Sequence, residues 1–126
     1  MQTEPDTRQS EPGRIFREAW ITGVRRHYPG DPKPGYVASW DDTPEWERQA
    51  AGAVYRQVAD FVEVSAGATA KLTREQKGRF VALCWIAQIH KHIAEPKPSY
   101  IADWDALPDW QQQTDADIFE EIERRA

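Results

Sequence analysis

The sequence predicts an all-α fold built from two helix-loop-helix units. Residues 32–58 align without a gap with residues 96–122 and share the same residue at several positions, which indicates an internal repeat. Apolar residues recur at helical spacing on both sides of each repeated loop. One such unit is too small to bury its apolar face alone, so we expect two of them to face each other about a pseudo-twofold axis and share one core.

The repeat is carried mainly by aromatic residues, prolines and an aspartate. A shift of 64 residues aligns two Pro-Lys-Pro loops and the residues that follow them. The identical pairs include Tyr36 and Tyr100, Trp40 and Trp104, Asp41 and Asp105, Pro44 and Pro108, and Trp46 and Trp110. Upstream, a shift of 65 residues aligns Trp20 with Trp85 and His27 with His92.

The first unit is predicted to begin with a helix that starts at residues 10–12, whose residue types are common at helix N-termini. The proline- and glycine-rich residues 29–35 end this helix. They favour an extended path through residues 36–40, which leaves room for one short pair of strands between the units. The second helix is expected to have Thr43 as its N-cap and Pro44 at its first position.

The second unit repeats this scheme. Thr73 and Gln76 have the spacing of a capping box and open a strongly apolar helix. Residues 96–105 form its loop, and Pro108 opens the last helix. Small residues at 65–71 predict a turn or short linker between the units.

These elements define one domain, residues 13–126, made of repeats 13–64 and 73–125 after a flexible N-terminus, residues 1–12. No apolar run approaches the roughly 20 residues of a membrane helix. The polar start of the chain lacks the apolar segment of a secretory signal. We therefore expect a cytoplasmic protein without membrane association.

Charge and motifs exclude several functional classes. The net charge of −5 disfavours nucleic-acid binding, which needs a basic surface. The sequence has no phosphate-binding glycine loop, no dinucleotide fingerprint, no CxxC and no HExxH. The histidines stand beside basic residues at predicted helix ends, which indicates dipole complementation rather than a metal site. They are His27, His90 and His92. We predict no metal, no cofactor and no enzyme activity.

Asp41 and Asp105 are the candidates for a two-carboxylate mechanism. Each stands just before a predicted helix N-terminus, where a carboxylate accepts backbone hydrogen bonds. The sequence favours this capping role over a hydrolase, which remains the least favoured alternative.

Six tryptophans in 126 residues indicate packing or recognition. The four in the repeated loops are expected to hold those loops against the helices as core. Trp20 and Trp85 lie midway along the first helix of each unit and could face each other across a cleft. Around them we expect the rest of a ligand site: Lys33, Lys97, Arg26 and His92 for an anionic group, with Tyr36 and Tyr100.

The chain resembles the ryanodine receptor repeat (RyR domain) in a bacterial or phage form. The similarity lies in REAW at residues 17–20, KPGYVASWDD at 33–42 and TPEWER at 43–48, with LPDWQQQTDADIF at 107–119. It departs from the family pattern where His is replaced before the tryptophan and in the loop. The resemblance implies a paired helical module used for recognition, with adenine nucleotides bound between aromatic residues at the positions of Trp20 and Trp85.

The sequence therefore predicts a non-enzymatic module that binds a small planar or nucleotide-like ligand between its two repeats. The alternative is a protein-interaction or self-association module that uses exposed tryptophans and the acidic last helix, and in that case a protein partner or homodimer is expected.

Overall fold

The structure is a computed structural model that describes residues 5–126, with side chains from residue 12 onward. All regular structure within this range is helical, so the predicted all-α class is confirmed. Residues 36–40 and 100–104 each join two short 3₁₀ turns through two extended residues, and the strand pairing that the sequence allowed is not present in residues 5–126. The elements are α1 (Pro5–His27), η1 (Pro34–Val37), η2 (Trp40–Asp42), α2 (Glu45–Val64), η3 (Ala68–Lys71), α3 (Arg74–His92), η4 (Pro98–Ile101), η5 (Trp104–Ala106) and α4 (Asp109–Arg125).

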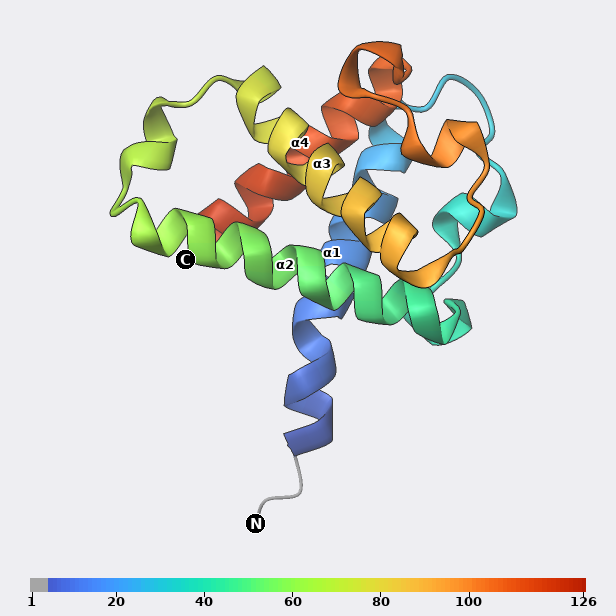
Figure 1. Cartoon of the computed structure of the whole chain (residues 1–126), viewed down its shortest axis with the longest axis horizontal. Helices are drawn as coiled ribbons and strands as arrows, with labels where there is room; N and C mark the ends of the chain where they lie inside the picture. The colour runs from blue at the N-terminus through green and yellow to red at the C-terminus, as the bar shows by residue number, and fades with distance from the viewer. Residues whose placement is uncertain (1–4) are drawn as a thin grey trace.

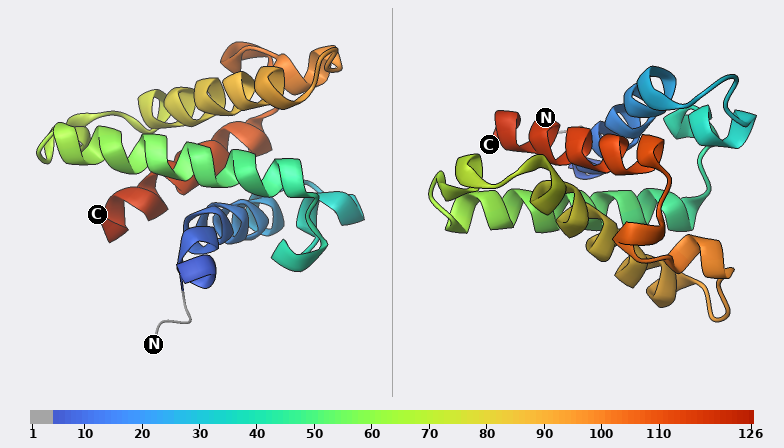
Figure 2. Two further views of the ribbon diagram at one scale, coloured as in Figure 1. Left: turned by 60° about the horizontal axis from the view of Figure 1, so that its bottom comes forward. Right: turned by 90° about the horizontal axis from the view of Figure 1, so that it is seen from above.

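Both halves of the chain have the same order of elements, two long helices separated by two 3₁₀ turns. Helices α1 and α3 each pack against both α2 and α4. The two loops that carry η1–η2 and η4–η5 lie at one end of the molecule, and η3 lies at the other end (Figures 1 and 2). The order of elements agrees with the predicted repeat, whereas the pseudo-twofold axis stays a prediction.

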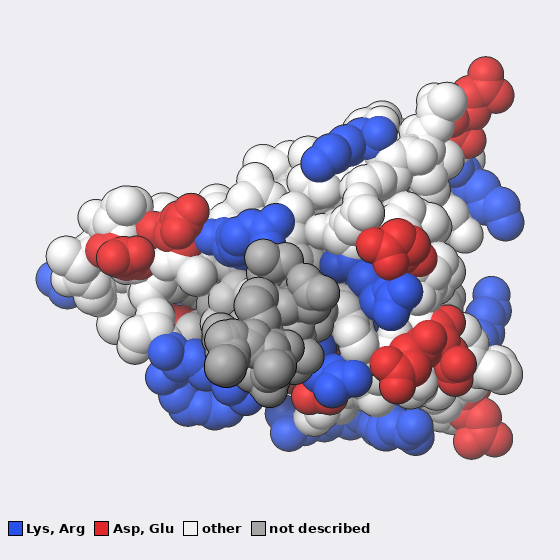
Figure 3. Space-filling model, turned by 90° about the horizontal axis from the view of Figure 1, so that it is seen from below, with Lys and Arg blue, Asp and Glu red and all other residues white. Residues whose placement is uncertain are grey.

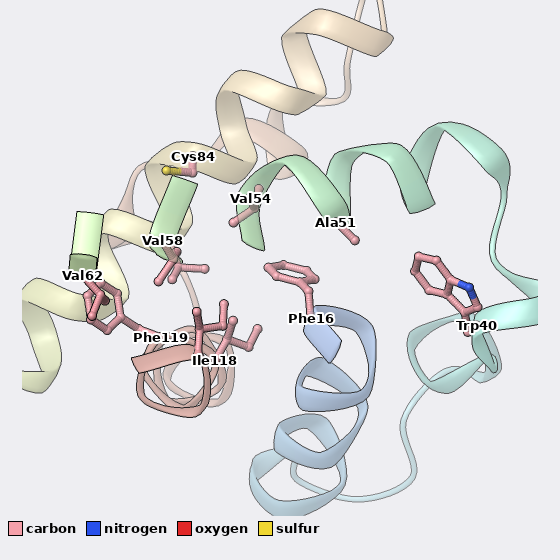
Figure 4. Close-up of a cluster of buried hydrophobic side chains, with 11 residues drawn as sticks. Phe16, Trp40, Ala51, Val54, Val58, Val62, Cys84, Ile118 and Phe119 are labelled. Atoms are coloured by element: carbon pink, nitrogen blue, oxygen red, sulfur yellow. The ribbon is translucent and has the colours of Figure 1, made fainter. Parts of the chain in front are cut away.

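The core lies where the four helices meet, and Figure 4 shows part of it. Phe119 of α4 is fully buried and makes edge-to-face contacts with Phe61 and Phe80, with ring centroids 6.2 and 6.1 Å away. Phe16 of α1 points toward Ala51 and Val54 of α2 (Figure 4). Other fully buried side chains come from all four helices: Val24, Val58, Val81, Ile118 and Ile122. A core shared by both halves is the expected result if neither half can bury its own apolar face.

Two predicted helix starts are wrong and one is confirmed. Helix α1 begins at Pro5, ahead of the predicted start, so residues 5–12 of the predicted flexible segment are helical and residues 1–4 lie outside the described range. Thr43 is not the N-cap of α2, because Pro44 takes that position with ψ 152° and the Thr43 hydroxyl donates to the Ser39 carbonyl at 2.8 Å. The capping box of α3 is present with both of its hydrogen bonds.

Each loop is anchored by a tryptophan that covers a glycine on the preceding helix. A methyl group added at Gly13 would lie 2.6 Å from the tip of Trp40, and one added at Gly78 would lie 2.3 Å from the tip of Trp104. The glycines thus let the indoles approach the helix backbone closely. The expected role of Trp40 and Trp104, to hold the loops against the helices, agrees with these contacts.

Basic and acidic side chains are interspersed on the face shown in Figure 3.

None of the helices described in residues 5–126 combines the length and apolarity that crossing a membrane requires.

Candidate ligand-binding cavity

A cavity of about 620 Å³ lies between the two halves, and helices and loops from both line it. Its volume falls within the range of roughly 300–1,000 Å³ that is typical of small-molecule sites. Its walls are rich in aromatic residues and include five of the six tryptophans and three of the four tyrosines. These are Trp20, Trp40, Trp46, Trp85, Trp110, Tyr28, Tyr36 and Tyr100, and we call this space the aromatic cavity.

The indoles of the aromatic cavity form pairs that cross between the halves. Trp20 of α1 contacts Trp110 at the start of α4, with ring centroids 5.8 Å apart and planes at 64°. Trp85 of α3 lies 6.4 Å from Trp46 at the start of α2 and stacks on Phe16 at 5.6 Å and 13°. Each half therefore completes the aromatic wall of the other, so the cavity requires both halves.

Two further rings extend these pairs. Tyr28 lies 5.0 Å from Trp110, and His92 lies 5.9 Å from Trp46. Tyr28 lines the aromatic cavity, whereas His92 is not among the lining residues. The Nε2 atom of His92 is buried without a hydrogen-bond partner among the described residues.

Trp20 is held in a defined orientation by a hydrogen bond. Its indole Nε1 donates to the Tyr36 carbonyl at 2.9 Å, which joins α1 to η1. Trp20 and Trp85 both line the aromatic cavity while they pack against the core. The two residues that the sequence selected are therefore wall residues whose apolar bodies also contribute to packing.

Arg17 fixes the first loop from inside the protein. Its Nε and Nη2 donate to the Ala38 carbonyl at 3.0 and 2.8 Å, and Nη2 also donates to the Gly35 carbonyl at 3.0 Å. Its Nη1 lies 3.7 Å from the Glu47 carboxylate. Burial raises the pKa of Glu47, while Arg17 opposes that rise. Both residues line the cavity, but they neutralise each other.

Asp115 is the unusual residue of the cavity wall. It is only 6% exposed, and no hydrogen bond or ion pair joins its side chain to another described residue. Burial raises the pKa of Asp115 well above its usual value. A carboxyl in this position destabilises the folded protein once it ionises, because it has lost most of its contact with water and no donor among the described residues replaces it.

Replacing Asp115 with Asn should therefore stabilise the protein at pH 8, by about 1–3 kcal/mol. The folded protein keeps the Asp115 proton to a higher pH than the unfolded chain does, so stability falls as pH rises above the unfolded pKa of about 3.9. The advantage of Asn should thus shrink toward zero near pH 3, as measured by urea unfolding at several pH values. Asp109→Asn, in the exposed first turn of α4, should instead lower the stability at pH 8, because it removes a carboxylate that interacts favourably with the helix dipole. Equal stabilities of Asp115→Asn and wild type at pH 8 would contradict this assignment.

The structure brings together five of the eight predicted site residues. Trp20, Trp85, Lys33, Tyr36 and Tyr100 line the aromatic cavity. Lys33 extends over Tyr36, with its Nζ 5.7 Å from the ring centroid.

The remaining predicted residues are elsewhere. Lys97 is exposed and lies over Tyr100, with its Nζ 5.8 Å from the ring centroid. Arg26 points into a separate hollow and pairs with Asp117 at 3.6 Å. His92 lies behind Trp46. The predicted anion site of Lys33, Lys97, Arg26 and His92 is therefore not assembled as a group.

Asp41 and Asp105 do not cap the following helices, so that expectation is wrong. Their side chains are 83% and 82% exposed and pair with Arg14 at 3.6 Å and Arg79 at 2.9 Å. Pro44 and Pro108 occupy the N-cap positions of α2 and α4. Neither aspartate lines the aromatic cavity. The described residues also contain no cluster of three or more potential metal ligands.

Sequence reasoning missed several wall residues. Trp46 and Trp110 were expected in the core. Their matching positions at the start of the second helix of each unit could have identified them as candidate wall residues. Asp115 had a weaker signal, an acidic residue within the apolar stretch of the last helix. Arg17 and Glu47 lie within the stretches REAW and TPEWER, but neither was predicted as a site residue, because their contacts form only in the folded chain.

Comparisons of the chain with protein-family models, curated proteins and solved structures find no match. The functional assignment therefore rests on the residues of the aromatic cavity and on the resemblance described above.

Proposed function

We propose that this protein is a non-enzymatic binding module that holds a planar, nucleotide-like ligand in the aromatic cavity. The main observation is the concentration of five of the six tryptophans on one cavity wall that both halves build. Indole faces attract flat rings, and a stacked base typically contributes about 1–3 kcal/mol. The RyR-like resemblance leads to the same residues, Trp20 and Trp85.

The orientation of the wall supports this proposal. The hydrogen bond from Trp20 to the Tyr36 carbonyl and the stacking of Trp85 on Phe16 hold the rings before a ligand arrives. Preorganised rings lose little conformational entropy on binding. Lys33 is the one cationic side chain of the wall that has no carboxylate partner among the described residues, and it can attract a phosphate at the cavity edge.

Tryptophan fluorescence tests the proposal directly. We expect purine nucleotides to quench the emission in a saturable way, because most of the indoles line the binding space. A Trp20→Leu/Trp85→Leu double variant keeps an apolar side chain at both positions and should weaken binding by at least about 30-fold, since two stacking contacts are lost. Its affinity would be measured by isothermal titration calorimetry, with helical circular dichroism to confirm folding.

Trp104→Phe provides the matched control, because Trp104 is the one tryptophan outside the cavity wall. It should bind like the wild type. The proposal fails if no purine nucleotide or free purine base binds the folded wild-type protein, or if the double variant binds as tightly as Trp104→Phe.

A further inference from the structure

Among the charged residues that line the aromatic cavity, Asp115 is the one whose side chain has no hydrogen-bonding, ionic or cation–π partner within the part of the chain that the structure describes. Arg17 and Glu47 form an ion pair, and Arg17 also saturates two backbone carbonyls. Lys33 lies over the Tyr36 ring at the cavity edge. Asp115 makes no hydrogen bond or ion pair with any described residue, although it is only 6% exposed. Asp115 is therefore the buried acidic or basic side chain of the cavity lining whose hydrogen-bonding capacity is left unused among the described residues.

We propose that Asp115 makes the aromatic cavity selective for flat nitrogen heterocycles that present two adjacent N–H donors, the donor edge of guanine-type and pterin-type rings. This inference rests on the ring-binding function proposed above. It adds the feature that stacking cannot supply, because every heterocycle has a face but only some have this edge.

Carboxylate chemistry defines the ligand class. An ionised carboxylate only accepts hydrogen bonds, and its two oxygens match two parallel N–H groups. Guanine offers this pair through its ring N–H and its exocyclic amino group. Adenine offers an acceptor at the corresponding ring position, so it leaves the ionised carboxylate partly unpaired and matches only the protonated form, whereas two N–H donors favour the ionised form. An unpaired buried acceptor is disfavoured, and this difference generates selectivity.

The neighbours of Asp115 support this geometry. Gln111 stands one helical turn earlier on α4 and also lines the cavity. Trp110, just before Gln111, contacts Trp20 from the other half. Helix α4 therefore presents hydrogen-bonding groups beside an aromatic face, and a ring that stacks there can turn its edge toward Asp115.

Calorimetric titration with GMP, IMP and AMP tests the inference while the phosphate and ribose stay constant. We expect the wild type to bind GMP about 10- to 100-fold more tightly than AMP, the discrimination typical of a paired hydrogen-bond contact. IMP has the ring N–H but lacks the amino group, so its affinity should be intermediate. Asp115→Asn should remove most of the preference by weakening GMP at least about 10-fold while AMP changes less than about threefold.

Asp109→Asn is the matched control, since it removes an exposed carboxylate from the same helix outside the cavity. It should keep the wild-type order of affinities. If GMP and AMP bind the wild type equally, or if Asp115→Asn weakens both equally, the inference is wrong while the ring-binding function stands. If none of the three nucleotides and no free base binds, both proposals fail together. The ratio of GMP to AMP affinity in the wild-type protein tests the inference without any substitution.

Discussion

Replacing Arg17 with methionine should lower the free energy of unfolding by about 3 kcal/mol, the low end of the range for breaking a buried ion pair. Arg17 is 6% exposed and donates three hydrogen bonds to the carbonyls of Gly35 and Ala38. Methionine keeps an unbranched apolar side chain but leaves these carbonyls without their donor and the Glu47 carboxylate without its cationic partner. Urea unfolding measures the loss.

The loop should respond more strongly than the rest of the protein. Arg17 holds η1, and the Tyr36 carbonyl in η1 receives the Trp20 indole N–H. We therefore expect faster hydrogen exchange in residues 34–38 and weaker ligand binding. Arg17→Lys keeps the charge but loses the planar fork, so its loss should be intermediate.

Arg14→Met is the matched control on the same helix, because the pair of Arg14 with Asp41 is largely exposed. Surface pairs of this kind contribute roughly 0–1 kcal/mol. A loss for Arg17→Met no larger than that for Arg14→Met would contradict the anchoring role of Arg17.

Gly13→Ala should destabilise the protein by about 1–3 kcal/mol through overpacking. The new methyl group would lie 2.6 Å from the tip of Trp40, 3.1 Å from the Arg48 carbonyl and 3.1 Å from the Gly52 backbone nitrogen. Two of these three atoms belong to backbone and cannot turn away. The intrinsic helical preference of alanine over glycine, about 1 kcal/mol, offsets only part of the strain.

Gly52→Ala at the same helix crossing should have the opposite effect. Its methyl group would meet the flexible end of Arg56 at 3.6 Å and Gly13 at 3.9 Å, which are ordinary contacts. Alanine should therefore stabilise α2 by about 0.5–1 kcal/mol. Thermal unfolding of the two variants separates the effects, and the steric account fails if Gly13→Ala is as stable as Gly52→Ala.

A stability cost at Asp115 would fit a binding role. The buried carboxyl of Asp115 makes no stabilising polar contact with the described residues of the folded protein. A ligand that donates hydrogen bonds to it would replace the bonds to water that were lost on folding. A variant more stable than the wild type but poorer at selecting its ligand is the expected signature of a binding residue.

Local patterns in the sequence were sufficient to predict the helical class and most of the element order. The spacing of apolar residues predicted four helices, and Thr73 with Gln76 predicted a capping box that the structure contains. These features depend on residues a few positions apart, so periodicity and local hydrogen bonding reveal them. The start of α1 and the cap of α2 were wrong, because polar residues at 6–11 are compatible with helix and Pro44 rather than Thr43 adopts the capping conformation.

The repeat in the sequence identified Trp20 and Trp85 as candidate binding residues, and both line the aromatic cavity. Only the tertiary structure decided how that cavity is completed. Trp20 meets Trp110 and Trp85 meets Trp46 because helices far apart in the chain pack together, and the same packing buries Asp115 without a hydrogen-bond partner among the described residues. The pattern of residues along a chain reflects the local preference for helix, turn or cap. The burial of a side chain and the choice of its partners depend on segments that are distant in the sequence, so the sequence pattern alone does not predict them.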